Sequence, residues 1–378
     1  MIYLDNAATT QVCPEAAQAA VRAMTLDFGN PSSRYPLGKA AASAMAAARS
    51  EVAAALGCGA DEVFFTSCGT EGDNWAIRGA LELGRRRGKH IITTAFEHSA
   101  VLEPCKALER EGYEVTYLRP GKSGHISMDA LRTALRPDTV LVSIMLVNNE
   151  LGTVQDLAGA AGAIKEAGSP ALLHTDAVQG FLKIPFTPKE LGVDLLTVSG
   201  HKIRAPKGIG ALYIRKGLRF PPLLLGGGQE NGLRSGTEPT AQIAAFAASC
   251  RLGRETRGEY TPRMSALKQY ALESLLSALP ELRQVGVGDA PHILCLTLPG
   301  YKSEVLVRVL GDLGVCVSAG SACHRGRPSH VFAALGISKK EMDGAFRVSF
   351  SPESTREEVD GLRDALVRAR DMLFTTLS

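Results

Sequence analysis

The stretch ALLHTDAVQGFLKIPFTPKELGVDLLTVSGHK, residues 171–202, decides the fold class of this chain. It contains two short apolar runs, 171–175 and 195–199, and polar residues follow each run directly. Continuous apolar runs of this length are typical of strands that helices cover on both faces. The gap between the second run and the next strand pattern, ALYIR at 211–215, holds no helix pattern. We therefore expect this last strand to pair antiparallel with its neighbour.

The same alternation extends toward the N-terminus. Apolar, β-branched runs predict further strands at 63–67, 90–94, 114–118 and 140–147. Helix-length segments lie between the strands, at 73–87, 99–111 and 154–167, and an Ala-rich helix pattern at 37–56 precedes the first strand. Strands that alternate with helices predict a mainly parallel central sheet with crossover helices. The fold class is therefore α/β.

The pattern changes after residue 250. A helix at about 262–278, a helix at 303–313 and a final helix accompany strand patterns at 292–298, 315–319 and 346–350. Thr355 and Glu358 have capping-box spacing at the start of the final helix. A chain of 378 residues exceeds what one core usually absorbs. We predict a large α/β domain at 14–255 and a smaller α+β domain formed by 1–13 and 256–378.

Composition and charge limit the class of function. The net charge of +3 is close to neutral for this length, so nothing favours direct binding to nucleic acid or to a membrane surface. No apolar run is long enough to span a bilayer, and the N-terminus carries no secretory signal pattern. The eight cysteines are scattered without a CxxC pair, which favours reduced thiols. We expect a cytoplasmic protein.

Polar residues follow the predicted strands one after another. Because ligands bind at the carboxyl ends of parallel strands, we expect these side chains to surround one crevice. They are Gly69 and Thr70 after the first strand, His98 after the second, Asn149 after 140–147, Asp176 and Gln179 after 171–175, and Ser199, His201 and Lys202 after 195–199. The small-residue turn at Gly69 and Thr70, followed by a helix, suits a phosphate group. An equally good interpretation makes Thr70 only the N-cap of that helix.

These residue types favour one cofactor. No GxGxxG motif follows the first strand and no Walker A motif occurs, so a dinucleotide or nucleoside triphosphate site has no support. A lysine that faces an aspartate and a phosphate cradle indicates pyridoxal 5'-phosphate, because lysine binds its aldehyde and a carboxylate keeps its ring nitrogen protonated. We expect no metal site.

Several stretches together resemble one family. They are YLDNAATT (3–10), FGNPSS (28–33), TEGDN (70–74), EHSAV (97–101), VNNELGTVQ (147–155), HTDAVQ (174–179), SGHKIRAPKGIGALYI (199–214), GGGQENGLRSGT (226–237) and SACHRG (321–326). In this order the chain is similar to cysteine desulfurases of the NifS/IscS type. Those proteins are class V aminotransferases, enzymes of fold type I that depend on pyridoxal phosphate.

The resemblance implies a role for each site residue. Lys202 would hold the cofactor and shuttle a proton, Asp176 would pair with the ring nitrogen, and His98 would stack over the ring and assist acid–base steps. Gln179 and Asn149 would approach the phenolic oxygen, and Arg347 would bind the substrate carboxylate together with Asn149. Gly69, Thr70, Ser199 and His201 would hold the phosphate, with Thr237 reaching in from a second subunit. For Arg347 a place on a solvated strand face is the alternative.

Cys323 lies in SAGSACHRGRPSH (318–330), between small residues and basic ones. The resemblance implies that its thiolate takes sulfur from L-cysteine, releases L-alanine and passes the persulfide sulfur to an acceptor, either an iron–sulfur scaffold or a tRNA-thiolation enzyme. Neighbouring His324, Arg325 and Arg327 favour the thiolate, and Cys68 is the rival nucleophile. The segment after Cys323 is shorter than in the family. The alternatives are a selenocysteine lyase, another pyridoxal phosphate-dependent β-lyase, or a non-catalytic binding protein.

Overall fold

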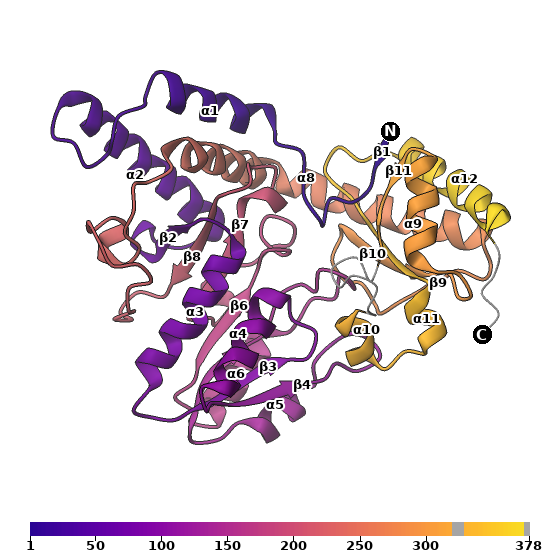
Figure 1. Ribbon diagram of the computed structural model, residues 1–378, viewed down its shortest axis with the longest axis horizontal. Coiled ribbons are helices and arrows are strands. Elements are labelled where there is room, and N and C mark those ends of the chain that lie inside the picture. The colour runs from indigo at the N-terminus through magenta and orange to yellow at the C-terminus, as the bar shows by residue number, and fades with distance from the viewer. Residues whose placement is uncertain (320–328, 374–378) are drawn as a thin grey trace.

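A seven-stranded sheet forms the centre of the larger part of the computed structural model, which describes residues 1–319 and 329–373 (Figure 1). Its strands are β2 (Val63–Thr66), β3 (His90–Thr94), β4 (Glu114–Leu118), β5 (Thr139–Ser143), β6 (Leu172–Asp176), β7 (Leu195–Ser199) and β8 (Gly210–Ile214). Their order is β2-β8-β7-β6-β5-β3-β4. β8 pairs antiparallel with β2 and β7, whereas all other pairs are parallel. The mainly parallel α/β sheet and its antiparallel last strand are confirmed.

Helices cover both faces of this sheet. They are α2 (Pro36–Leu56), α3 (Gly69–Gly84), α4 (Ser99–Arg110), α5 (Met128–Ala134), α6 (Leu157–Glu166) and α7 (Pro188–Leu191). The helix α1 (Pro14–Thr25) packs in a separate small core, where its Ala16 lies with Ala245. Neighbouring strand residues belong to different cores: Ile91 lies in the core that includes side chains of α3 and α4, and Ile92 lies in the core that includes side chains of α2 and α6. Leu195 and Leu196 divide in the same way. The strands are continuously apolar because neither face meets water.

A smaller antiparallel sheet lies beside the first. Its strands are β9 (Arg283–Gln284), β10 (Ile293–Thr297), β12 (Ser318–Ala319) and β13 (Ala345–Ser349), in the order β12-β13-β10-β9. β1 (Ile2–Tyr3) pairs in parallel with β11 (Val315–Cys316). The single strand predicted at 315–319 is therefore wrong: the chain changes partner at Val317, from β1 to β13. The remaining helices are α9 (Ser303–Asp312), α10 (His330–Leu335), α11 (Lys339–Asp343) and α12 (Arg356–Met372), with 3-10 turns η1 (Ala60–Glu62), η2 (Gly200–Lys202) and η3 (Glu230–Gly232).

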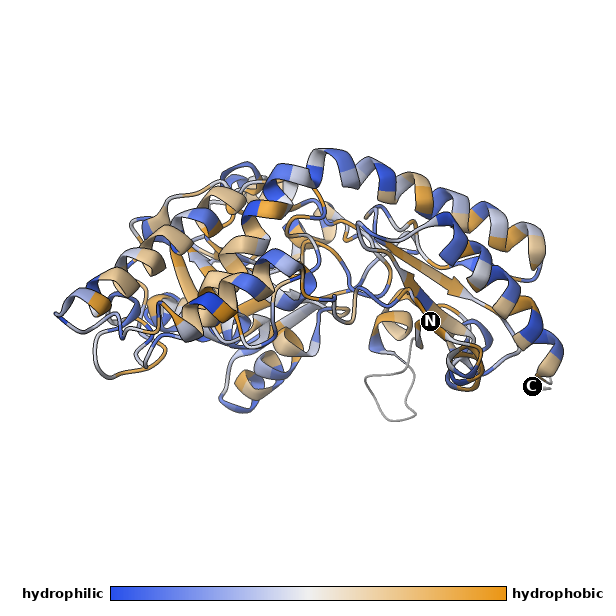
Figure 2. Cartoon of the chain, turned by 90° about the horizontal axis from the view of Figure 1, so that it is seen from above, coloured by the Kyte–Doolittle hydropathy of each residue, from blue (hydrophilic) through white to orange (hydrophobic). Residues whose placement is uncertain are grey.

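One long helix, α8 (Thr240–Ala278), joins the two parts. Figure 1 shows it running from α1 and α2 toward the smaller sheet, and Figure 2 shows the largely hydrophilic outer side of the long helix at the edge of the molecule. Phe246 and Cys250 of α8 belong to the core of the larger part, whereas Leu267 and Leu275 belong to that of the smaller part. The helix predicted at 262–278 was too short, because Pro262 lies inside the helix and does not start it. The predicted domain division, whose boundary falls within α8, stays a prediction.

Two other boundaries differ from the sequence prediction. α3 begins at Gly69 and not at residue 73. Its first turn contains Gly69 and Gly72, which lie close to the sheet: a Cβ on Gly72 would lie 2.7 Å from Thr197 Cγ2. β5 ends at Ser143 and not at residue 147, although the Leu146 amide still donates to the Asp176 carbonyl of β6 at 2.9 Å. The capping box of Thr355 and Glu358 at the start of α12 is confirmed. Within the described residues, no helix is both long and apolar enough to cross a membrane.

Candidate active site

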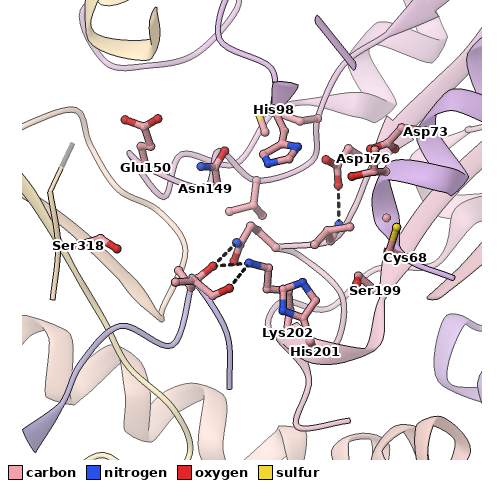
Figure 3. A pocket seen from close by; sticks show the side chains of 18 of the residues that line it. Cys68, Asp73, His98, Asn149, Glu150, Asp176, Ser199, His201, Lys202 and Ser318 are labelled. Atoms are coloured by element: carbon pink, nitrogen blue, oxygen red, sulfur yellow. Dashed lines mark hydrogen bonds between the residues drawn. The ribbon is translucent and has the colours of Figure 1, made fainter. Parts of the chain in front are cut away.

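A cavity of about 380 Å³ opens where β6 and β7 end and where the N-terminal segment and the smaller sheet meet the larger one (Figure 3). Most of the site residues predicted from sequence line this one cavity: Gly69, Thr70, His98, Asn149, Asp176, Gln179, Ser199, His201, Lys202 and Arg347. Thr237 does not line it and is exposed to solvent. Cys323 and its basic neighbours His324, Arg325 and Arg327 lie outside the described residues. The geometry therefore brings together side chains that are far apart in sequence.

Lys202 is positioned by the turn that follows β7. It ends η2, where the Ile203 amide closes the turn on the Gly200 carbonyl at 2.9 Å. Gly200 has to be small, since a Cβ there would lie 2.8 Å from Ile209 Cγ2. Lys202 Nζ donates to the carbonyls of Ala7 and Ala8, both at 2.7 Å. The carbonyls of Ala7 and Ala8 thus hold the amine at the cavity wall.

Asp176 closes the inner end of the cavity. Burial, with help from the neighbouring Asp73 carboxyl, raises the pKa of Asp176 to about 7. The Val178 amide donates to Asp176 Oδ1 at 2.9 Å and favours the charged form. A buried carboxyl of this kind has a strong need for a cationic partner, because without one its charge is poorly solvated.

Two buried titratable groups near Asp176 were not expected from the sequence: Asp73, which also lines the cavity, and His174. Asp73 is 1% exposed, its Oδ1 lies 3.5 Å from His174 Nε2, and burial raises its pKa to about 7. His174 Nδ1 lies 2.8 Å from Ser143 Oγ, and burial lowers the pKa of the imidazole to about 4. The available signal was a histidine inside the apolar run of residues 171–175.

His98 is oriented by the helix that it caps. Its Nδ1 accepts the Ala100 amide at 3.1 Å as the N-cap of α4, so the neutral ring carries its proton on Nε2. Burial lowers the pKa of His98, and the charge of Lys202 acts in the same direction, against that of Asp176. The imidazole therefore tends to be neutral and faces the cavity (Figure 3).

The part of the cavity wall formed by the start of α3 and the end of β7 suits an anion. The N-terminus of α3 points its first amides there, and such amides favour negative charge. Ser199 Oγ is buried and has no hydrogen-bond partner among the described residues. Thr70 lies in the first turn of α3, and the N-cap is Cys68, so the interpretation of Thr70 as N-cap is wrong. Burial, followed by the charge of Lys202, lowers the pKa of His201 to about 4.

Arg347 forms the wall on the side of the smaller sheet. It belongs to β13 and is 8% exposed, so the alternative of a solvated strand face is wrong. Its Nη1 donates to the Asn149 carbonyl at 2.7 Å, which joins the two sheets across the cavity. Glu150 also lines the cavity, and burial raises its pKa to about 7.

Comparison with known proteins gives one consistent result. Residues 2–362 match the family described as Aminotransferase class-V. The chain is 42% identical over 364 residues to a cysteine desulfurase of Trichormus azollae, covering 95% of this chain and 90% of that protein. It is 42% identical to the cysteine desulfurase IscS of Methanosarcina thermophila, covering 95% and 89%. A solved NifS-like protein superposes with a TM-score of 0.93 at 35% identity, covering 98% of this chain and 100% of that one.

Proposed function

The chain belongs to the aminotransferase class-V family, and we propose from this premise that it is a cysteine desulfurase. L-cysteine and the thiol of Cys323 would give L-alanine and a persulfide on Cys323, so one C–S bond breaks and one S–S bond forms. The observation that carries the proposal is the cavity that unites Lys202, Asp176, His98 and Arg347. Its support is the likeness to named cysteine desulfurases over 95% of the chain.

The residues present fit pyridoxal 5'-phosphate. Ser199 Oγ, which is buried without a partner, and the N-terminus of α3 would hold the phosphate, together with Gly69, Thr70 and His201. Asp176 would hold the ring nitrogen, and Lys202 Nζ would hold the aldehyde carbon. Gln179 donates its Nε2 to the Ala7 carbonyl at 2.9 Å and would lie near the phenolic oxygen. When bound, this cofactor supplies a ring that stabilises negative charge at the substrate Cα.

The side chains of this chain divide the remaining work. Lys202 Nζ would take and return the proton of the substrate Cα, since the carbonyls of Ala7 and Ala8 hold the amine in place. Asp176 would stay charged once a cationic ring nitrogen lies beside it, because an opposite charge lowers the pKa of a buried carboxyl. His98, whose pKa is lowered by burial, would exchange a proton at Nε2. Arg347 and Asn149 would bind the substrate carboxylate.

Cys323 would be the sulfur acceptor. The described residues before it, Ser318 and Ala319 of β12, line the cavity. After Cys323, His330 begins α10, and its Nε2 lies 2.8 Å from the carbonyl oxygen of Glu97. Both flanks therefore start near the site of chemistry. Cys68 also lines the cavity and is the internal alternative.

A second copy of the chain and an acceptor protein complete the proposal. Exposed apolar side chains gather along α1 and the segment that follows it: Val21, Met24, Leu26, Phe28 and Tyr35. A group of exposed apolar side chains of this kind is typical of a surface that another protein covers. We propose that a second copy of the chain covers it, in a homodimer in which Thr237 contributes to the partner's phosphate site. The persulfide would pass to an iron–sulfur scaffold or a tRNA-thiolation enzyme in the cytoplasm.

The test is alanine release from L-cysteine together with the visible absorbance of the bound cofactor. Lys202→Ala should lose alanine release, and Cys323→Ala should lose it while keeping the cofactor. Lys207→Ala is the matched control, because Lys207 is an exposed lysine on the same turn. Alanine release by Lys202→Ala or Cys323→Ala at the wild-type rate would contradict the proposal.

A further inference from the structure

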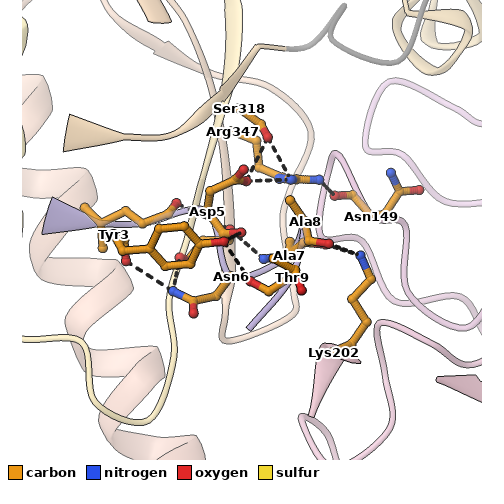
Figure 4. A network of polar contacts seen from close by, with 12 residues as sticks. Tyr3, Asp5, Asn6, Ala7, Ala8, Thr9, Asn149, Lys202, Ser318 and Arg347 are labelled. Carbon is orange, nitrogen blue, oxygen red and sulfur yellow. Dashed lines mark hydrogen bonds and ion pairs between the residues drawn. The ribbon is translucent and has the colours of Figure 1, made fainter. Parts of the chain in front are cut away.

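The guanidinium of Arg347 already holds a carboxylate of this chain. Arg347 Nη2 donates to Asp5 Oδ1 at 2.8 Å and to Ser318 Oγ at 3.1 Å, and Ser318 Oγ donates to the same Asp5 oxygen at 2.7 Å (Figure 4). The side chains of Arg347 and Asp5 are 10% and 19% exposed. Asp5 thus forms a largely buried ion pair with the residue that we propose binds the substrate carboxylate.

Asp5 is held in this place by its backbone. It forms a β-bridge with Ser349, and its carbonyl accepts the Tyr3 hydroxyl at 3.2 Å. The next residues continue along the cavity, where the carbonyls of Ala7 and Ala8 accept Lys202 Nζ. The N-terminal segment therefore links the residue that holds the guanidinium to the residues that hold the amine (Figure 4).

Three of the five N–H donors of Arg347 are committed to groups of this chain. Nη1 is taken by the Asn149 carbonyl and Nη2 by Asp5 and Ser318, while Nε is buried and has no partner among the described residues. A guanidinium binds a carboxylate best through two parallel N–H groups. A second carboxylate that approaches this fork meets the charge of Asp5, and two like charges near one cation repel each other.

We propose that Asp5 is a counter-carboxylate of Arg347 that lowers the affinity of the site for α-carboxylates. The choice of L-alanine and L-cysteine as the ligands concerned rests on the proposed function. Asp5 balances the buried guanidinium when no substrate is present. When an α-carboxylate arrives, Asp5 weakens its binding, so the product alanine is held less tightly. Because the repulsion acts between two carboxylates, the effect of Asp5 is confined to ligands that carry a carboxylate.

Asp5→Asn separates charge from geometry. The amide oxygen still accepts from Arg347 and Ser318, but the negative charge is gone. Removing one like charge beside the binding fork should tighten L-alanine binding to the holoenzyme about tenfold. L-alaninamide, which lacks the carboxylate, should bind with unchanged affinity. Asp5→Ala, which removes the side-chain oxygen as well, should shift L-alanine affinity in the same direction.

The test is isothermal titration calorimetry of the holoenzyme, which measures the dissociation constants of L-alanine and L-alaninamide. Glu353→Gln is the matched control, because Glu353 pairs with Arg204 at 2.6 Å outside the cavity, and its L-alanine affinity should equal that of the wild type. In steady state, Asp5→Asn should lower the KM for L-cysteine without raising kcat. Weaker or equal L-alanine binding by both Asp5 variants would overturn the inference. Failure of the wild type to release alanine from cysteine would instead overturn the proposed function. The comparison of L-alanine with L-alaninamide binding would still test the role of Asp5.

Discussion

The buried carboxylate of Glu230 accepts three hydrogen bonds, so its removal should have a large effect on the free energy of unfolding. Arg49 Nη1 and Nη2 of α2 donate to its two oxygens at 2.7 and 2.6 Å, and the Phe65 amide of β2 donates at 2.8 Å. The side chains of Arg49 and Glu230 are 16% and 3% exposed. Glu230 also has a positive φ of 50°, so these contacts hold a strained turn.

Glu230→Ala should lower the free energy of unfolding by about 3–5 kcal/mol, since removing one partner of a buried ion pair leaves the other charge unpaired. The assay is equilibrium unfolding in urea, followed by the fluorescence of Trp75. This is the single tryptophan of the chain, it is 1% exposed, and its Nε1 donates to the Pro221 carbonyl at the base of the same loop.

Asp27→Ala is the matched control for Glu230→Ala. Asp27 also accepts from an arginine, Arg22, at 2.8 Å, but their side chains are 40% and 70% exposed. Its loss should leave the unfolding midpoint unchanged within error. A loss below about 1 kcal/mol for Glu230→Ala would contradict a stabilising role of this buried pair, because it would place the pair in the range of surface ion pairs.

Three further predictions concern the cavity. Gly72→Ala places a methyl group 2.7 Å from Thr197 Cγ2, so it should destabilise the protein by about 1–3 kcal/mol in urea unfolding, and an unchanged midpoint would mean that α3 can shift at no cost. Ser199→Ala should raise the dissociation constant of pyridoxal phosphate about tenfold in an absorbance titration, because a hydrogen bond to a charged group is lost, and equal affinity would remove Ser199 from the phosphate site. Burial raises the pKa of Asp73 from 3.8 to about 7, so the native protein binds more protons than the unfolded chain in this window. The unfolding free energy of the cofactor-free protein should therefore fall as the pH rises through that window, and Asp73→Asn should flatten the fall, whereas an identical slope would contradict the assignment.

The central sheet could be predicted from sequence because its signal is local. Residues such as Ile91 and Ile92, or Leu195 and Leu196, are apolar in succession since both faces are covered. The N-terminal half of α8 was missed because Pro262 has the appearance of a helix start. Here the local signal pointed to the wrong boundary.

The cavity could be predicted in outline for the same reason, since parallel strands place their carboxyl ends together. Asp176 and Lys202 follow β6 and β7 directly and line one cavity, as expected. The pairing of Asp5 with Arg347 could not be predicted, because 342 positions separate the two residues and only the fold brings them together. Asp73 was likewise missed, since its meaning depends on the burial of its carboxyl beside His174.

The central claim is that Cys323 receives the sulfur of L-cysteine, and peptide mass spectrometry after a single turnover tests it most directly. Cys68 is the internal comparison, since it is the other candidate thiol and lines the cavity. We expect one added sulfur atom on the peptide that carries Cys323, none on the peptide that carries Cys68, and alanine released in equal amount. Sulfur on Cys68, or alanine released without a persulfide on Cys323, would contradict it.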